Sequence, residues 1–286
     1  MGAADVIRTK KIGIIGCGNL GQAVMKAFLD SGLVQAQNVF ITNTRLEKSE
    51  KLAREYGVNA LATNEELVEK VDVVIIGVKP QDIYQIIEPI ASVFHEDHIV
   101  MSLAAGVTVQ ALQSLIPDCK NHIRVMPNTA ARVKKSVIAY STSHSAQSHV
   151  PWVEMLLSTM GYVVAVEDSD EMQAVVVGAS SGVGFVFELM IYWKEWLEER
   201  GIEPDIAKKI TVQTFLGASI LAEEASQTSL DELQRKVTSS KGVTAAGLNS
   251  IRELEIERAL RYSFEKAALR DKELGESWQK SEKNRG

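Results

Sequence analysis

The chain has 286 residues, of which 45% are hydrophobic and 24% are charged, and its formal net charge is −6. This composition is typical of a soluble protein with one large or two modest domains. The negative charge and the lack of Lys/Arg clusters argue against nucleic acid or an anionic membrane surface as a partner.

Signals of compartment and processing are few. Two cysteines, Cys17 and Cys119, cannot build a disulfide framework and are typical of a reducing compartment. We expect no membrane helix, since no apolar run approaches the ~20 residues that a span requires. The amino terminus lacks an apolar signal core. These features predict a cytoplasmic protein with no membrane partner.

The amino-terminal segment predicts a nucleotide-binding unit. A short apolar strand, residues 11–15, runs directly into Gly16-Cys17-Gly18-Asn19-Leu20-Gly21, and a helix from Gln22 to Leu29 and a second strand, residues 39–42, follow. In this context the G-x-G-x-x-G spacing indicates dinucleotide binding. Gly16 permits a tight turn, Gly18 lets the backbone approach a pyrophosphate, and Gly21 lets helix and strand pack closely. The free N–H groups at the helix start then face the phosphate charge.

The residues after the second strand indicate which cofactor binds. An NAD(H) site usually places Asp or Glu here to accept hydrogen bonds from the ribose, whereas this chain reads Thr42-Asn43-Thr44-Arg45 with no acid before Glu47. Arg45 can pair with a 2′-phosphate as a bidentate fork, and Asn43 and Thr44 can donate to it. We therefore predict a preference for NADP(H) over NAD(H). A solvated loop arginine is the alternative.

Apolar runs then continue at the spacing of alternating strands and helices. Together they predict an α/β fold with a doubly wound sheet. The predicted strands are residues 71–77, 98–103, 123–126, 137–140 and 162–166, and the predicted helices lie near residues 46–56, from residue 64, and near 83–94, 109–115 and 152–160.

The character of the sequence changes near residue 168, where strand signals end. Residues 183–196 are apolar around almost the whole circumference of a helix, which predicts burial on all sides. Further helices are predicted at about 204–224 and 245–275. A small helical half with such a helix often completes its core with a second subunit, so we expect at least a dimer. The predicted domains are a dinucleotide-binding Rossmann domain (1–168), a helical dimerisation and substrate domain (169–276) and a disordered polar tail (277–286).

Three further segments follow strand ends, the ligand face of such a sheet. Each one alone is compatible with a plain strand-to-helix turn, but their shared placement favours contact with cofactor or substrate. Lys79 is expected to contribute through its backbone at least. The residues concerned are Val78, Lys79 and Pro80, then Leu103, Ala104 and Ala105, and finally Asn128.

Late in the chain, residues 237–248 carry polar and small residues into a helix whose first N–H groups can hold a substrate carboxylate. An ordinary helix capped by Ser239 or Ser240 is the alternative. No metal site is predicted, because the five histidines are scattered and residues 95–98 read as a solvated turn. The lack of a serine nucleophile elbow suits hydride transfer, in which the cofactor supplies the chemistry.

The ordered set of these segments resembles the pyrroline-5-carboxylate reductase family over about residues 10–276, with further matches at residues 213–218 and 270–275. The resemblance implies a Rossmann domain, a helical dimerisation domain and reduction of the C=N bond of 1-pyrroline-5-carboxylate to proline by NADPH, with NADH possible. It also implies a homo-oligomer and a cyclic imino acid as substrate. The carboxylate would rest on Ser239, Gly242, Val243 and Thr244. Thr244, near the imine, would be the catalytic residue, although a protonated imine or a water is an alternative proton source.

The chain also departs from the family pattern. The usual V-T-S-P-G-G-T-T run is altered at Ser240, Lys241 and Val243, and Val176 and Val183 stand where the family has Thr and Pro. Two alternatives therefore stay open: a divergent paralogue that reduces another cyclic imine, and a nucleotide-binding regulatory protein with little turnover. A hydroxyacid dehydrogenase is disfavoured, because its lysine-bearing helix motif is missing from the sequence.

Overall fold

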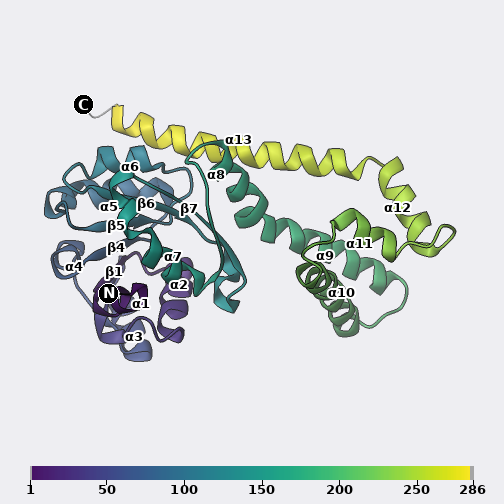
Figure 1. Cartoon of the computed structure of the whole chain (residues 1–286), viewed down its shortest axis with the longest axis horizontal. Helices are drawn as coiled ribbons and strands as arrows, with labels where there is room; N and C mark the ends of the chain where they lie inside the picture. Colours follow the sequence, from purple (N-terminus) through teal and green to yellow (C-terminus); the bar gives the residue numbers. More distant parts are fainter. Residues whose placement is uncertain (1, 284–286) are drawn as a thin grey trace. The chain divides into compact units, whose positions relative to one another are not determined.

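The structure is a computed structural model that describes residues 2–283, with side chains described through Gly275. It divides into two compact units (Figure 1). The first comprises the chain up to Ser181 together with residues from Ala267 onward, and the second is Gly182–Lys266. The division by packing therefore falls later than the domain boundary predicted at residue 168, and the last helix contributes to both units.

One eight-stranded sheet runs through the first unit, with strand order β3-β2-β1-β4-β5-β6-β7-β8. Figure 1 labels its strands β1, β4, β5, β6 and β7. Strands β1 to β6 are parallel, β7 is antiparallel to β6, and β8 is parallel to β7. This mostly parallel sheet confirms the predicted α/β fold. The strands are β1 (Ile12–Ile15), β2 (Val39–Thr42), β3 (Asn59–Ala60), β4 (Val73–Ile76), β5 (Ile99–Ser102), β6 (Asn121–Met126), β7 (Ser136–Thr142) and β8 (Gly161–Ala165).

Helices cover both faces of the sheet. In β4, Val73 and Ile75 belong to one buried cluster and Val74 and Ile76 to the other, which is why this strand reads as a continuous apolar run. The first cluster contains residues of α1 (Ala3–Thr9), α2 (Asn19–Asp30), α3 (Leu46–Tyr56) and α7 (Val150–Ser158). The second contains residues of α4 (Asn64–Lys70), α5 (Ile83–Ile87) and α6 (Val109–Leu115).

Several short elements have no counterpart in the sequence prediction, because segments of a few residues carry no detectable periodicity. They include α1 and β3. The others in the first unit are the 3-10 helices η1 (Ala36–Asn38), η2 (Pro80–Asp82), η3 (Glu88–Val93), η4 (Thr129–Val133) and η5 (His144–His149), then α8 (Asp170–Val175) and the π-helical turn η6 (Val176–Ser181).

Two predicted helices are wrong in their continuity. The helix predicted near residues 83–94 changes to a 3-10 helix at Glu88, because Pro89 has no N–H to donate. The helix predicted over 245–275 is two helices, α12 (Val243–Glu253) and α13 (Ile256–Lys283), separated by Glu255 in the left-handed region at φ 51°. The tail predicted to be disordered from residue 277 is helical in α13 to Lys283, and residues 284–286 lie outside the described residues.

The second unit is helical, with α9 (Gly182–Glu199), α10 (Pro204–Glu224), α11 (Leu230–Lys236), α12 and the start of α13. The prediction that residues 183–196 are buried on all sides is wrong for the single chain, because α9 has no buried residue. Apolar side chains of α9 and α10 are instead exposed. They are Val186, Phe187, Leu189, Ile191, Tyr192, Trp193 and Trp196 on α9, and Ile206, Ile210, Val212, Leu216, Ile220 and Leu221 on α10.

The run of helix from Asp170 to Glu199 differs from the expectation that no apolar run approaches the length of a membrane span. It has a window of mean hydropathy 1.9 and is long and apolar enough, by length and composition, to cross a membrane. Only 17% of that window is buried in the chain. A helix that buries an apolar surface against a partner subunit meets the same criteria, because both surroundings are apolar.

Candidate active site

The turn between β1 and α2 has the geometry that its three glycines predict. Gly16 has φ +84°, and a Cβ there would lie 2.5 Å from Cγ1 of Val78. The backbone N–H of Gly16 donates to the carbonyl of Thr42 at 3.1 Å, which fixes the turn against the end of β2. At Gly21 a Cβ would lie 3.0 Å from the carbonyl oxygen of Gly16. The glycine turn and the first turn of α2 therefore approach too closely for a side chain at either position.

The amino terminus of α2 is open to an anion. Gly18 is its N-cap residue, and no side chain accepts a hydrogen bond from the first N–H groups. The N–H groups that follow, at Asn19 and Leu20, are therefore left for a phosphate. Cys17, within the turn, is buried, and burial raises the pKa of its thiol to about 12 although Lys48 acts in the opposite direction. This thiol stays protonated at neutral pH and is unsuited to act as a nucleophile.

The loop after β2 places its polar residues at the surface. Thr44 and Arg45 are exposed, and Arg45 is the N-cap residue of α3. The carboxamide of Asn43 donates from Nδ2 to Oγ of Ser49 at 3.1 Å, and Ser49 is fully buried. Ser49 thus fixes the orientation of Asn43. No motif in the sequence predicts this role of Ser49.

The loops after β4 and β5 offer mainly backbone groups. Val78 packs against the glycine turn, whereas Lys79 is exposed at the start of η2, which begins with Pro80. After β5, the side chains of Leu103 and Ala104 are buried, and Ala105, which is half-buried, follows them. The side chains of Leu103 and Ala104 belong to the core, so any contact with a cofactor is made by their backbone.

Asn128, after β6, uses its carboxamide within the protein. Its Oδ1 accepts from the N–H of Ala130 at 3.0 Å and its Nδ2 donates to the carbonyl of Ala179 at 3.1 Å. Nearby, the hydroxyl of Ser180 donates to the carbonyl of Pro127 at 3.1 Å. These bonds attach the end of β6 to the π-helical turn η6. The predicted cofactor residue is therefore held in place by two structural hydrogen bonds.

The predicted substrate segment lies in the second unit and forms the start of α12. The alternative that Ser239 or Ser240 caps this helix is wrong, because Gly242 is the N-cap residue and no side chain caps the first N–H groups. A Cβ at Gly242 would overlap the hydroxyl of Ser239. Val243 is 93% exposed, and Thr244 is exposed as well. The structure thus places the four predicted substrate residues together around one uncapped helix terminus.

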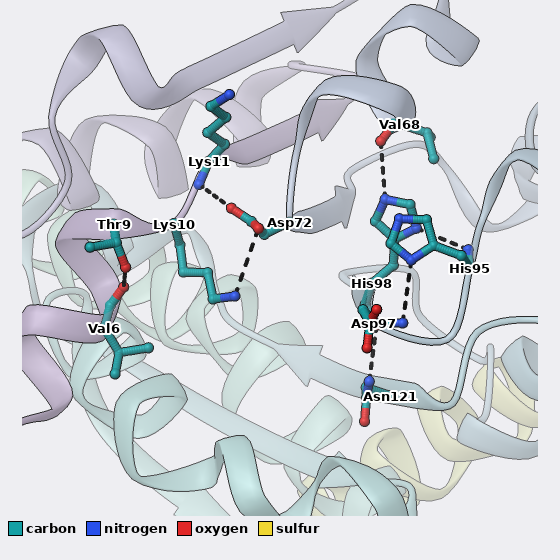
Figure 2. Close-up of polar contacts among 10 residues, drawn as sticks. All are labelled: Val6, Thr9, Lys10, Lys11, Val68, Asp72, His95, Asp97, His98 and Asn121. Carbon is teal, nitrogen blue, oxygen red and sulfur yellow. Dashed lines mark hydrogen bonds and ion pairs between the residues drawn. The ribbon is translucent and has the colours of Figure 1, made fainter. Parts of the chain in front are cut away.

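Residues 95–98, which precede β5, differ in burial from the solvated turn predicted there. His98 is buried, and its Nε2 lies 3.1 Å from the carbonyl oxygen of Val68 (Figure 2). Its ring stacks on that of His95, with ring centroids 3.6 Å apart. The interpretation of a wholly solvated turn is therefore wrong for His98. Among the described residues, no group of three or more His, Cys, Asp or Glu side chains could hold a metal ion.

Two family models match the chain. Residues 11–106 match the model described as NADP oxidoreductase coenzyme F420-dependent. Residues 169–274 match the model described as pyrroline-5-carboxylate reductase dimerisation, which supports a homo-oligomer. The second match begins with α8 and includes the exposed apolar helices.

Similar proteins span nearly the whole chain. Pyrroline-5-carboxylate reductase 2 of Bacillus subtilis is 30% identical over 94% of this chain and 96% of its own length, and the Haemophilus influenzae reductase is 31% identical over 84% and 88%. The structure of the Coxiella burnetii reductase has a TM-score of 0.85 at 26% identity, covering 93% of this chain and 99% of its own. A Plasmodium falciparum reductase with NADP bound has a TM-score of 0.84 at 19% identity, covering 94% and 99%, and shows the shared fold. The chain belongs to the pyrroline-5-carboxylate reductase family.

Proposed function

We propose that this protein reduces the C=N bond of 1-pyrroline-5-carboxylate to give L-proline, with NADPH as the reductant. The observation that carries this proposal is the pair of uncapped helix termini, one behind the glycine turn and one at the segment 239–244, in a chain that aligns with named reductases over nearly its full length. The first terminus suits a pyrophosphate and the second a small carboxylate.

The residues present fit NADPH. The turn that contains Gly16, Gly18 and Gly21, with the N–H groups of Asn19 and Leu20, would hold the pyrophosphate. The exposed guanidinium of Arg45, with Asn43 and Thr44, binds the 2′-phosphate, and no acid in this loop repels it before Glu47. The remaining contacts come from the loops after three strands, at Val78, Lys79 and Pro80, at Leu103, Ala104 and Ala105, and at Asn128.

The substrate site uses the start of α12. Its N–H groups, with the hydroxyl of Ser239 and the backbone of Gly242 and Val243, hold the carboxylate of the imino acid. NADPH supplies the hydride to the imine carbon when it is bound. Thr244, as the catalytic residue, places its hydroxyl near the imine nitrogen and holds or donates the proton there. Orientation of two bound molecules is then the main task of the protein.

The protein works as a homo-oligomer that is at least a dimer. The exposed apolar side chains of α9 and α10 form a surface that a second copy covers, as the dimerisation model over residues 169–274 supports. The net charge of −6 disfavours a nucleic acid partner. We place the protein in the cytoplasm, where a small-molecule reductase meets its substrate and NADPH.

A comparison of three imines tests the proposal. NADPH oxidation is measured with 1-pyrroline-5-carboxylate, with 1-pyrroline, which lacks the carboxylate, and with the six-membered-ring imino acid. We expect the carboxylated five-membered ring to be preferred, and Thr244→Ala to lower kcat without weakening NADPH binding. A preference for the six-membered ring would support the divergent paralogue. Tight NADPH binding with no turnover of any imine would support a regulatory protein.

A further inference from the structure

The loop between β5 and α6, residues 103–108, is held by groups that the proposed reaction does not use. These groups surround a cavity of about 450 Å³ in the first unit. Its lining includes Gly106, Arg124, Asp168, Asp271 and Gly275. The first lies in the loop, the next two come from β6 and from the segment after β8, and the last two come from α13. The cavity therefore marks where the last helix meets the loop.

The backbone of α13 touches the loop directly. Gly106 has φ +72°, and a Cβ on it would lie 3.0 Å from the backbone nitrogen of Gly275 and 3.3 Å from the carbonyl oxygen of Asp271. A Cβ on Gly275 would lie 2.9 Å from the carbonyl oxygen of Gly106. Two glycines thus face each other, and neither position accepts a side chain without a shift of backbone.

A carboxylate fixes the far end of the same loop. Asp168 accepts from the backbone N–H of Val109, the first residue of α6, with its Oδ2 at 2.5 Å. Its Oδ1 pairs with Nη1 of Arg124 at 2.7 Å, and the side chain of Arg124 is only 5% exposed. One carboxylate therefore joins β6 to the start of α6, and the loop is fixed between this bond and the glycine contact.

Further contacts hold α13 in this place. The carboxamide of Gln173, in α8, donates from Nε2 to the carbonyl of Ala268 at 3.1 Å. Asp271 has a buried Oδ1 without a hydrogen-bond partner among the described residues. Burial raises the pKa of this carboxyl group, and the nearby positive charge of Arg124 opposes that shift. Because the net shift of this pKa is upward, burying the ionised Asp271 costs more than its attraction to Arg124 returns, and the Gln173 bond and the glycine contact are what hold the helix here.

We infer that Gly275 and Asp168 are positioning residues for NADPH: they fix the loop 103–108, whose Leu103–Ala105 backbone contacts the cofactor. The inference rests on the proposed cofactor role of Leu103, Ala104 and Ala105. By this inference α13 has two roles. It ends the dimerisation region matched over residues 169–274, and its Gly275 holds the loop 103–108 in place.

Two variants with matched controls test the inference. Gly275→Ala adds one methyl group where the carbonyl of Gly106 lies, and Asp168→Asn replaces one of the two carboxylate oxygens that accept from Val109 and pair with Arg124. The control for the first is Lys272→Ala, an exposed residue on the same helix. The control for the second is Asp170→Asn, two residues further on and also beside the cavity, with no ion pair among the described residues. Each full-length protein is measured for NADPH affinity by fluorescence titration and for deuterium exchange over residues 103–108.

We expect NADPH to protect residues 103–108 in the wild-type protein. Gly275→Ala and Asp168→Asn should each weaken NADPH binding by ~10-fold, which corresponds to about 1.4 kcal/mol, and should speed exchange in the loop without NADPH. The controls should match the wild type. KM for NADPH should rise more than kcat falls, a split that a general loss of folded protein would not produce.

The cofactor contacts of the loop and the positioning role of Gly275 and Asp168 can be contradicted separately. If NADPH binds the wild type without protecting residues 103–108, the proposed cofactor contacts of this loop are wrong, and the inference falls while the reductase activity stands. If NADPH protects the loop but the Gly275→Ala and Asp168→Asn variants bind NADPH as the controls do, the contacts stand and the positioning role is wrong.

Discussion

Asn128 donates from Nδ2 to the carbonyl oxygen of Ala179 at 3.1 Å, so the residue at the end of β6 is hydrogen-bonded to the π-helical turn that follows α8. Asn128 is 7% exposed, and its Oδ1 also accepts from the N–H of Ala130. Asn128, which the sequence predicts as a cofactor contact, therefore also joins the end of β6 to the turn η6.

Asn128→Ala should lower the free energy of unfolding by about 1–3 kcal/mol, because the variant loses two half-buried hydrogen bonds, to Ala130 and to Ala179, each worth about 0.5–1.5 kcal/mol. Urea denaturation of the variant, with the exposed Thr129→Ala as control, measures this change. An unfolding free energy equal to that of the control would show that Asn128 does not hold this junction.

Arg45→Asp should reverse the cofactor preference. The guanidinium is replaced by a carboxylate that repels a 2′-phosphate and accepts from a ribose hydroxyl, so the ratio of kcat/KM for NADPH to that for NADH should fall ~10-fold or more. Arg54→Ala, on the same helix but in its last turn, is the control. An unchanged ratio would remove Arg45 from the cofactor site.

Lys241→Gly restores the residue usual in the family at this position. Because the side chain of Lys241 is exposed in the loop before α12, we expect kcat/KM for 1-pyrroline-5-carboxylate to change by only about twofold. Steady-state kinetics with saturating NADPH measures this. A large gain would contradict the expectation and would indicate that the wild-type pocket is shaped for a different imine.

Phe187→Asp should prevent assembly. Phe187 is 59% exposed in the single chain, and a carboxylate at this position would be buried without a partner in the interface. Light scattering on the purified protein should show a monomer for this variant and an oligomer for Glu195→Gln, an exposed change on the same helix. An oligomer that persists in Phe187→Asp would place the interface elsewhere.

Stability should fall as the pH is lowered below about 6.5, the usual pKa of histidine. His122 is fully buried, and burial lowers its pKa, although the carbonyls of Ile116 and Lys120 act in the opposite direction. Between the usual pKa and the lowered one, His122 binds a proton in the unfolded chain but not in the folded chain. The free energy of unfolding therefore decreases as the pH falls through this range, by up to about 1.4 kcal/mol per pH unit.

The variant His122→Leu tests that origin, since it removes the titrating group and keeps a buried side chain. We expect a smaller decrease of unfolding free energy between neutral and mildly acidic pH than in the wild type, with the exposed His144→Gln as control. An equal decrease in all three proteins would assign the pH dependence to other groups.

The fold and the cofactor turn are well predicted from the sequence because both depend on local signals. Buried parallel strands are continuous runs of Val and Ile, and the glycine spacing before α2 requires only neighbouring residues. The break at Glu255 and the short helices lack such signals. The apolar residues of α9 predict burial on all sides, but the helix is not buried in the single chain. Burial of these residues requires a second copy, and the structure contains one chain.

The rest of the site depends on contacts between distant residues. Nothing in the sequence near Asp168 indicates that it would bond to Val109 and Arg124, and nothing near Gly275 indicates that it would face Gly106. The run Arg270–Gly275 stood out only as a match to the family. Its role becomes visible once α13 is placed on the loop after β5.

If this chain catalyses hydride transfer to 1-pyrroline-5-carboxylate, the purified protein oxidises NADPH and forms proline from that substrate. The most direct test is to mix the purified protein with that substrate and NADPH, with NADH in a parallel reaction, and to measure both cofactor oxidation and proline formation. We expect proline and oxidised cofactor to appear in equal amounts, faster with NADPH than with NADH. Binding of NADPH without oxidation or proline would contradict the reductase assignment while leaving the fold and the cofactor site in place.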